Sequence, residues 1–392
     1  MRKRTCSICE VYFWKNKMSI QFLKPTLPPW ELFKKAVQSF YETGMITNGP
    51  VVRQLEIAVE DIFRVGHAVA VSSCTSGLML ALRSLGVKGK VAIPSFTFFA
   101  TAHAVDWNGL EPVFVDVDEE TWTMSPEALR KAVAEHEGIT AVMPVHVFGN
   151  PCKVKELEAI CRENGHFLVY DSAHAMGSKV GDEWVGGFGH AEVFSLTPTK
   201  MVVAGEGGII TTGDGELAAR LRAGRNYGNE GDYDPEFVGL SARMSEFHAA
   251  LAIESFRSME LNVRRRNSLA QRYRENLKSV PGIYFQKVPE GCRSTFKDLT
   301  IRVVGEEFGM SRDELASYLA DSGIETRMYF YPPVHRTKAY WERYGKKYDD
   351  FLPVTNRLSR EALSLPMWSH MPEGVVDLVC ERIIQAHESD VK

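Results

Sequence analysis

The feature that most constrains this fold is a regular alternation of short apolar runs with helical segments over the first half of the chain. Six runs have the length and composition of buried strands: HAVAVSS, KVAIPS, EPVFVDVD, TAVMPVHVFG, HFLVYDSAH and AEVFSL. Helical or turn-rich segments, such as GLMLALRSLG and TFFATAHAVDWNG, separate all but the last pair. This order is typical of βαβ units, so we predict an α/β fold with a mostly parallel sheet and helices on both faces.

The pattern changes in the second half of the chain. One long helix is predicted over residues 249–277, followed by the strand-like DLTIRVV, a helix over residues 312–322, the segment IETRMYFY and a C-terminal helix, GVVDLVCERIIQAH. A chain of 392 residues also exceeds the size at which one core stops growing, about 250–300 residues. We therefore predict three parts: an N-terminal extension (1–21), a large domain (22–255) and a small C-terminal α/β domain (256–392).

Composition excludes several classes of protein. A net charge of −4 and a pI near 6.3 give no basic surface for nucleic acid. The sequence contains no apolar stretch long enough to span a membrane, and its first residues do not form a secretory signal. The seven cysteines are scattered and odd in number, which favours free thiols and a cytoplasmic location. Cys6 and Cys9 have the spacing of half a zinc site, but no second pair follows, so we predict no metal site.

Polar residues follow several of the predicted strands, where ligands bind in open α/β sheets. The first group is Ser72–Gly77, between a strand and a helix. Small residues let the backbone approach an anion, and the start of a helix offers free N–H groups, so this segment is a candidate phosphate site. A helix N-cap alone would explain one serine or threonine, but not the whole group.

Asp171 ends the apolar strand HFLVYD. Burial there would raise its pKa unless a cation faces it, and a protonated pyridine nitrogen is such a cation. Alternatively, its carboxylate caps the following turn. His174 comes three residues later and either contacts the same ring or is an ordinary interior histidine.

Lys200 follows another strand in FSLTPTK, close to Glu206-Gly207-Gly208. A lysine among apolar and hydroxyl side chains favours the neutral amine, which suits covalent catalysis on a carbonyl group. The alternative is a solvated surface lysine. The interval between Asp171 and Lys200 leaves room for one further strand, so both side chains could reach one ligand. The nearby PSFTFFAT could supply an aromatic ring that stacks on a flat heterocycle.

In this order, the segments resemble the DegT/DnrJ/StrS family of sugar aminotransferases, a branch of the fold-type-I pyridoxal-phosphate enzymes. The resemblance extends from about residue 22 to the C-terminal helix. It is carried by FLKPTLPPWE, GMITNGPVVRQLE, VSSCTSGLMLAL, PSFTFFATAHAVDWNGLEPVFVDVD, PVHVFGNP, DSAHAMGS, FSLTPTKMVVAGEGG, RNYG, ARMSEFHAAL, GIETRMYFYPPVH and LSLP.

The resemblance implies a role for individual residues. Lys200 is expected to bind pyridoxal 5'-phosphate covalently and to move protons as general base and acid, while Asp171 keeps the pyridine nitrogen protonated. The remaining cofactor contacts that it implies are Thr75, Ser76 and Ser195 at the phosphate and Phe98 over the ring face.

The resemblance also implies the substrates and the assembly. We expect glutamate as amino donor and a nucleotide-linked keto-sugar as acceptor, yielding an amino sugar for a surface polysaccharide or a secondary metabolite. A homodimer with shared active sites is implied, in which residues near Asn226–Arg243 reach across. Asn48, His335 and Tyr227, in the Tyr227–Tyr233 stretch, are candidate sugar contacts, although Asn48 also fits a plain turn and His335 a loop cap.

Three positions depart from the family pattern. His174 stands where a glutamine usually contacts the phenolic oxygen of the cofactor, and a histidine can make the same hydrogen bond. Cys74 replaces a glycine of the phosphate loop, which keeps the backbone donors but adds a side chain. Ser241 stands where an asparagine commonly reaches the phosphate of the neighbouring subunit.

Three other functions fit the sequence less well than an aminotransferase. Sugar dehydratases of the same family carry a histidine in place of the lysine, so Lys200 disfavours that reaction. A catalytically silent regulatory homologue is disfavoured by the intact pair of Asp171 and Lys200. A dinucleotide-binding oxidoreductase would need a G-x-G-x-x-G motif after an early strand, which the sequence lacks.

Overall fold

The central element is a seven-stranded sheet with the order β1-β9-β8-β5-β4-β2-β3. The computed structural model describes residues 19–229 and 231–390, so Cys6 and Cys9 lie outside the described residues. The strands of the seven-stranded sheet are β1 (His67–Val71), β2 (Lys90–Pro94), β3 (Glu111–Val115), β4 (Ile139–Val142), β5 (Phe167–Asp171), β8 (Ala191–Ser195) and β9 (Gly208–Thr212).

Neighbouring strands from β8 to β3 run parallel, whereas β9 is antiparallel to both of its neighbours. The mostly parallel mixed sheet predicted from the sequence is therefore confirmed. β9 was not among the predicted strands. Because β1 points the same way as β8, the carboxyl ends of six strands meet at one edge of the sheet.

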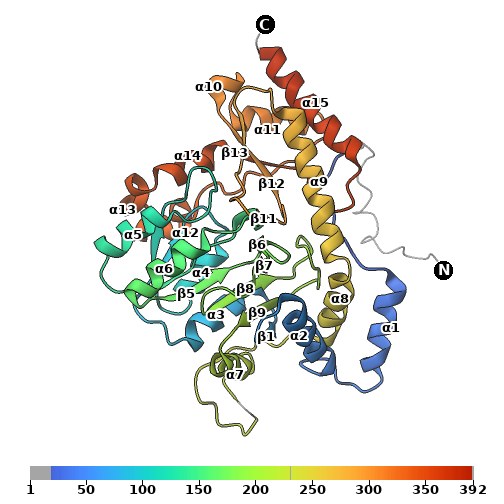
Figure 1. Cartoon of the computed structure of the whole chain (residues 1–392), viewed down its shortest axis with the longest axis vertical. Helices are drawn as coiled ribbons and strands as arrows, with labels where there is room; N and C mark the ends of the chain where they lie inside the picture. Colours follow the sequence, from blue (N-terminus) through green and yellow to red (C-terminus); the bar gives the residue numbers. More distant parts are fainter. Residues whose placement is uncertain (1–18, 230, 391–392) are drawn as a thin grey trace, which may run out of the picture.

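Helices cover both faces of this sheet (Figure 1). Alternate residues of β1 point to opposite faces, so Val69 and Val71 join one core and Ala68 and Ala70 the other. The helices of the large lobe are α1 (Trp30–Tyr41), α2 (Pro50–Phe63), α3 (Cys74–Ser84), α4 (Ala100–Asp106), α5 (Pro126–Glu135), α6 (Val154–Asn164), α7 (Gly215–Gly224) and α8 (Glu246–Phe256).

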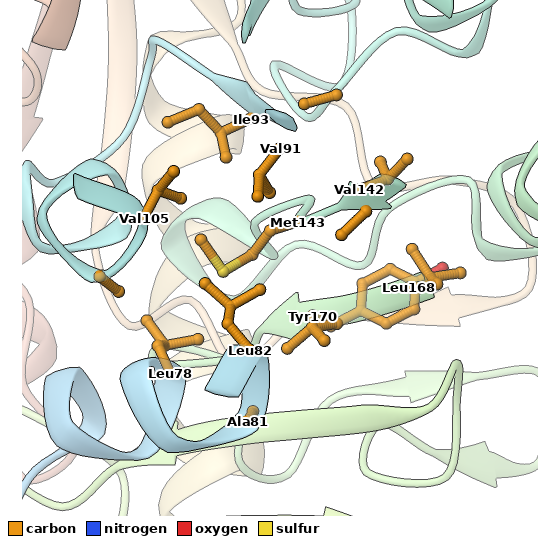
Figure 2. Close-up of a cluster of buried hydrophobic side chains, with 14 of the residues drawn as sticks. Leu78, Ala81, Leu82, Val91, Ile93, Val105, Val142, Met143, Leu168 and Tyr170 are labelled. Atoms are coloured by element: carbon orange, nitrogen blue, oxygen red, sulfur yellow. The ribbon is translucent and has the colours of Figure 1, made fainter. Parts of the chain in front are cut away.

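The larger core holds α3 in place. In Figure 2, Leu78 and Leu82 of α3 lie close to Met143 and to strands of the sheet, and all three side chains are buried. Gly77 packs so closely on β8 that a Cβ there would lie 2.7 Å from a methyl carbon of Val193. This packing fixes the N-terminus of α3 at the edge where the strands end.

A second core belongs to a small lobe built on the three-stranded sheet β10-β12-β13. Figure 1 shows this sheet beyond one end of the large sheet, with α9 running along the side of the molecule. Its elements are α9 (Met259–Leu277), β10 (Ile283–Phe285), β12 (Leu299–Val303), α10 (Gly305–Phe308), α11 (Arg312–Asp321), β13 (Ala362–Leu365) and α15 (Glu373–Asp390).

Two further groups of short elements complete the fold. Val334, Tyr340, Tyr348 and Leu352 pack into the large core, so this stretch of the C-terminal half covers the large sheet. Its helices are α12 (Lys338–Tyr340), α13 (Lys346–Tyr348) and α14 (Pro353–Glu361), and a three-stranded sheet is formed by β11 (Cys292–Arg293), β6 (Lys179–Val180) and β7 (Glu183–Trp184).

The long helix predicted over residues 249–277 is wrong in one respect, because the structure divides it into α8 and α9. Ser258 lies between them with φ −102° and ψ 0°, outside helical geometry. Its hydroxyl donates to the carbonyl of Ser255 at 3.0 Å, and the hydroxyl of Ser255 accepts from the amide of Val203 at 2.9 Å. Such side-chain bonds to the backbone compete with the helical ladder and explain the break.

Within residues 19–229 and 231–390, no helix combines the length and apolarity needed to cross a membrane. In that same part of the chain, no group of three or more histidine, cysteine or acidic side chains is arranged to hold a metal ion. The five cysteines in this part are free thiols, as predicted for them: Cys74, Cys152, Cys161, Cys292 and Cys380.

Candidate active site

A cavity of about 360 Å³ lies where the parallel strands of the large sheet end. Its size suits a small organic ligand or cofactor. The cavity is lined by Ser73, Cys74, Thr75, Leu78, Thr97, Phe98, Ala100, Val145, Asp171, Ala173, His174, Ser195, Thr197, Thr199, Lys200, Glu206, Lys297, Asp298, Tyr329 and Phe330. The sequence thus predicted residues from four strand ends that the structure brings to one cavity.

The N-terminus of α3 points into this cavity through Cys74 and Thr75. The hydroxyl of Ser73 caps the helix by accepting a hydrogen bond from the amide of Ser76 at 3.1 Å. In return, the hydroxyl of Ser76 accepts a hydrogen bond from the amide of Ser73 at 3.2 Å. The side chain of Ser76 is thus occupied by the cap and lies outside the cavity lining. The first amides of a helix have no partner within the helix, so this end of the cavity suits an anion.

Cys74 differs from its neighbours because its side chain is buried. The thiol points toward the carbonyl of Val193, 3.6 Å away, and burial raises the pKa of Cys74 well above its usual value. Behind it, Gly208 leaves no room for a side chain, since a Cβ there would lie 2.7 Å from the amide nitrogen of Cys74. The added side chain is therefore accommodated in the core and leaves the backbone donors facing the cavity.

Asp171 ends β5 and is only 5% exposed. Burial raises the pKa of its carboxyl group, while two donors oppose this: the hydroxyl of Thr101 at 2.8 Å and the amide of Ala173 at 3.1 Å. Thr101 in turn lies 2.9 Å from the hydroxyl of Thr97. The carboxylate is therefore fixed in position and calls for a cationic partner from the cavity.

Lys200 follows β8 and is held by a turn in which its amide donates to the carbonyl of Thr197 at 3.0 Å. Burial lowers the pKa of its ammonium group to about 7, and the positive charge of Lys297 adds to this shift. A large fraction of the amine is therefore neutral near pH 7, as a nucleophile for a carbonyl carbon must be.

His174 lies near Lys200 in the cavity lining, and burial lowers its pKa well below the usual value. Its Nδ1 accepts a hydrogen bond from the amide of Phe148 at 3.0 Å. The ring is therefore neutral with its proton on Nε2, so it can donate one hydrogen bond. Phe98 also lines the cavity; its ring lies against that of Phe99, with centroids 3.9 Å apart and an angle of 35° between the ring planes, and the residue remains 48% exposed.

Besides Ser76, four of the predicted residues lie away from the cavity lining. His335 is fully buried, with Nδ1 2.7 Å from the hydroxyl of Ser95 and Nε2 3.3 Å from Asp349, so both ring nitrogens already have partners within the chain. The other three are Ser241, Asn48 and Tyr227, all partly or largely exposed at the surface.

The structure adds residues that the sequence did not single out. Lys297 and Asp298 lie directly before β12, and Tyr329 and Phe330 belong to GIETRMYFYPPVH, in which only His335 was assigned as a candidate site residue. Nζ of Lys297 lies 2.9 Å from each carboxylate oxygen of Asp298. The side chains of Lys297 and Asp298 are 6% and 1% exposed. In the sequence, only the two adjacent opposite charges of FKDL directly before an apolar strand draw attention to this pair, and they do not show that it is buried.

These residues fit pyridoxal 5'-phosphate. The helix N-terminus and the hydroxyl groups of Thr75, Ser195 and Thr197 form a donor set for a phosphate. On other parts of the same cavity lie a buried carboxylate and a partly neutral amine, the groups that a cationic pyridine and an aldehyde require.

Comparison with known proteins places the chain among aminotransferases. The model of the DegT/DnrJ/EryC1/StrS aminotransferase family matches residues 30–384. Spore coat polysaccharide biosynthesis protein SpsC of Bacillus subtilis (strain 168) is 33% identical over 380 residues, covering 92% of this chain and 96% of SpsC. The dTDP-4-amino-4,6-dideoxy-D-glucose transaminase of Shigella dysenteriae is 31% identical over 362 residues, 92% of this chain and 97% of that enzyme.

Solved structures give the same result. DesI, crystallised in the presence of its TDP-sugar product, superposes with a TM-score of 0.89 at 31% identity, covering 96% of this chain and 95% of DesI. DesV of S. venezuelae, in complex with a ketimine intermediate, has a TM-score of 0.86 at 30% identity and covers 92% of this chain and 99% of DesV.

Proposed function

Because this chain belongs to the DegT/DnrJ/EryC1/StrS aminotransferase family of pyridoxal-phosphate-dependent sugar enzymes, we propose that it transfers an amino group from glutamate to a nucleotide-linked keto-sugar. The observation that carries the proposal is the presence of Lys200 and Asp171 on one cavity, beside the N-terminus of α3. The relatives that act on dTDP-sugars or were crystallised with a TDP-sugar favour thymidine diphosphate as the nucleotide. The product would be an amino sugar for a surface polysaccharide or a secondary metabolite.

When bound, pyridoxal phosphate supplies an aldehyde that bonds to amines and a cationic ring that accepts an electron pair. Lys200 would hold it through its amine, and Asp171 would keep the proton on the ring nitrogen. The α3 N-terminus, Thr75 and Ser195 would bind its phosphate, Phe98 would cover one face of the ring, and Nε2 of His174 would donate to its phenolic oxygen.

Lys200 would also move protons. Its Nζ, with a pKa of about 7, could accept the proton from the α-carbon of the donor and release it again within the cavity. In the second half of the cycle the same atom would move a proton in the opposite direction, on the carbon of the sugar that receives nitrogen. A pKa close to the working pH suits a group that must act as base and then as acid.

We also propose a homodimer with shared active sites. Ser241 and Tyr227 are exposed on the chain's own surface, away from its cavity lining, although both follow from the resemblance as candidate site residues. A second copy would bring them to the cavity of its neighbour, and Asn48 could contact the sugar there. Sedimentation of the purified protein, with and without pyridoxal phosphate, tests this assembly.

The decisive experiment is the visible spectrum of the purified protein before and after addition of glutamate. We expect a yellow absorption band that bleaches with glutamate and returns when a keto-sugar acceptor is added. A panel of nucleotide-linked keto-sugars, beginning with dTDP-sugars and read by mass spectrometry, would then identify the acceptor. Protein that stays colourless after reconstitution with pyridoxal phosphate would overturn the proposal.

A further inference from the structure

The cavity contains a second ammonium group that the proposed chemistry does not use. Lys297 lines the cavity together with Lys200, yet it is paired with both carboxylate oxygens of Asp298. An ammonium group has three donors, so one hydrogen atom of Lys297 remains for another acceptor. Burial of a charged pair is costly, and a pair maintained inside a binding cavity suggests a use in binding.

The position of this pair is fixed from both lobes. The amide of Lys297 donates to the carbonyl of Phe148 in the large lobe at 2.9 Å. Arg266 of α9, itself buried, donates to the carbonyls of Phe296 at 3.1 Å and Lys297 at 2.7 Å. The ammonium group of Lys297 also lies 5.5 Å from the centre of the Tyr329 ring. The pair is therefore held at a defined place before any substrate enters.

A transaminase must bind two different molecules at one site. The reacting end of an amino acid donor carries a carboxylate beside the amine, whereas the ring of a keto-sugar is uncharged where it reacts. A carboxylate in a cavity needs a cation or several donors. Among the cavity residues that the structure describes, Lys200 is engaged in the chemistry and His174 is neutral, which leaves Lys297.

We propose that Lys297 binds the carboxylate of the amino donor, and that Asp298 balances the charge of Lys297 when the uncharged sugar ring replaces the donor. This inference rests on the proposed function. The ligand is an α-amino acid carboxylate or the matching 2-oxo acid, bound by a charge-assisted hydrogen bond to Nζ of Lys297. Asp298 keeps the site neutral overall, which a single fixed cation would not do for the second substrate.

The test separates the two halves of the reaction. The variant Lys297→Gln/Asp298→Asn replaces the ion pair by two amides of similar shape, so no unpaired charge is left in the interior. Lys297→Arg keeps the cation. The control is Lys287→Gln, which removes a lysine from the exposed ion pair with Glu120. Each holoenzyme is followed by absorbance during reaction with glutamate alone, and then during reaction of the aminated enzyme with the keto-sugar alone.

We expect the double variant to raise the glutamate concentration for half-maximal rate on the order of 10- to 100-fold, the usual value of a hydrogen bond to a charged group. Its half-reaction with the keto-sugar should stay within about threefold of wild type, and Lys297→Arg should recover most of the glutamate affinity. Calorimetry with glutarate, a dicarboxylate that cannot react, should show the same weakening without any turnover. The control should match the wild-type protein throughout.

Three results would overturn this inference. An unchanged glutamate dependence would show that the donor carboxylate binds elsewhere. Equal losses in both half-reactions would make the pair a support for the cavity or a contact for the acceptor's phosphates. A shifted pH dependence of cofactor binding with unchanged glutarate affinity would make Lys297 a positioning residue for Lys200. In all three cases the wild type still bleaches with glutamate, so the proposed function would stand.

Discussion

The two sides of the cavity are built in different ways. One side, here called the sheet wall, consists of Ser73–Thr75, Asp171 and Lys200, and each of its parts lies at the end of a strand of the large sheet or within a few residues after it. The other side, here called the small-lobe wall, consists of Lys297, Asp298, Tyr329 and Phe330. The sheet wall is placed by parallel strands that end at one edge. The small-lobe wall is placed by contacts between distant segments, such as those from Arg266 and Phe148.

This difference assigns different tasks to the two walls. The sheet wall carries the groups that hold the cofactor and move protons, and a rigid sheet fixes them relative to one another. The small-lobe wall carries the groups that we assign to binding of the amino donor. Substitutions in the sheet wall should therefore affect every substrate equally, whereas substitutions in the small-lobe wall should affect stability or the donor alone.

The largest effect is expected at Lys200. Lys200→Ala removes the amine that binds the cofactor and moves the proton, so turnover should fall by a factor on the order of 10⁴ or more, with any donor. Steady-state rates with glutamate and a keto-sugar measure this, and circular dichroism checks that the fold is intact. Appreciable activity in the well-folded variant would show that another residue carries the chemistry.

The second largest effect is expected at Asp171. Asp171→Ala removes the anion opposite the ring nitrogen, and we expect a loss of about 3–4 kcal/mol or more of transition-state stabilisation. The loss should appear in kcat/KM for both substrates, because the ring serves both halves of the cycle. The bound cofactor is quantified by absorbance, so that weak binding is not mistaken for slow chemistry. Rates within a few-fold of wild type would point to a different acid.

A substitution of Arg266 tests the small-lobe wall. Its buried guanidinium donates to Phe296, Lys297 and the hydroxyl of Ser369, and burial lowers its pKa to about 10. Arg266→Met leaves these acceptors without a partner, so the free energy of unfolding should fall by about 2–4 kcal/mol. Denaturant unfolding measures the change. The exposed Arg265→Met serves as the control and should lie within about 0.5 kcal/mol of wild type.

The two walls also differ in how much of each could be predicted from the sequence. The family, the fold class and the strand ends of the large sheet were predicted because each depends on a short local motif. Asp171 and Lys200 could be proposed from the strand ends near which they lie, and the structure brings them to one cavity. Lys297 could not be placed, because no local pattern shows that Arg266 and Phe148 hold its backbone from two lobes. The burial of His335 against Ser95 could not be predicted for a related reason, because it depends on a contact between positions 240 residues apart.

The smallest effect is expected in the pH dependence of stability, and it arises from Lys200 in the sheet wall. Burial, followed by the charge of Lys297, lowers the pKa of Lys200 to about 7 in the folded protein, against 10.5 for an ordinary lysine. Between these two pH values the unfolded chain binds more protons than the folded one, so the cofactor-free protein should become more stable as the pH rises from 7 toward 10.

Lys200→Met removes this titration. It should stabilise the cofactor-free protein by about 1–2 kcal/mol at pH 7, and this difference should shrink as the pH rises. Denaturant unfolding of both proteins at several pH values measures it, with Lys287→Gln as an exposed control that should follow the wild type. A difference in the free energy of unfolding that stays constant with pH would mean that the pKa of Lys200 is not lowered in the cofactor-free protein. The amine of Lys200 would then become neutral only when the cofactor binds.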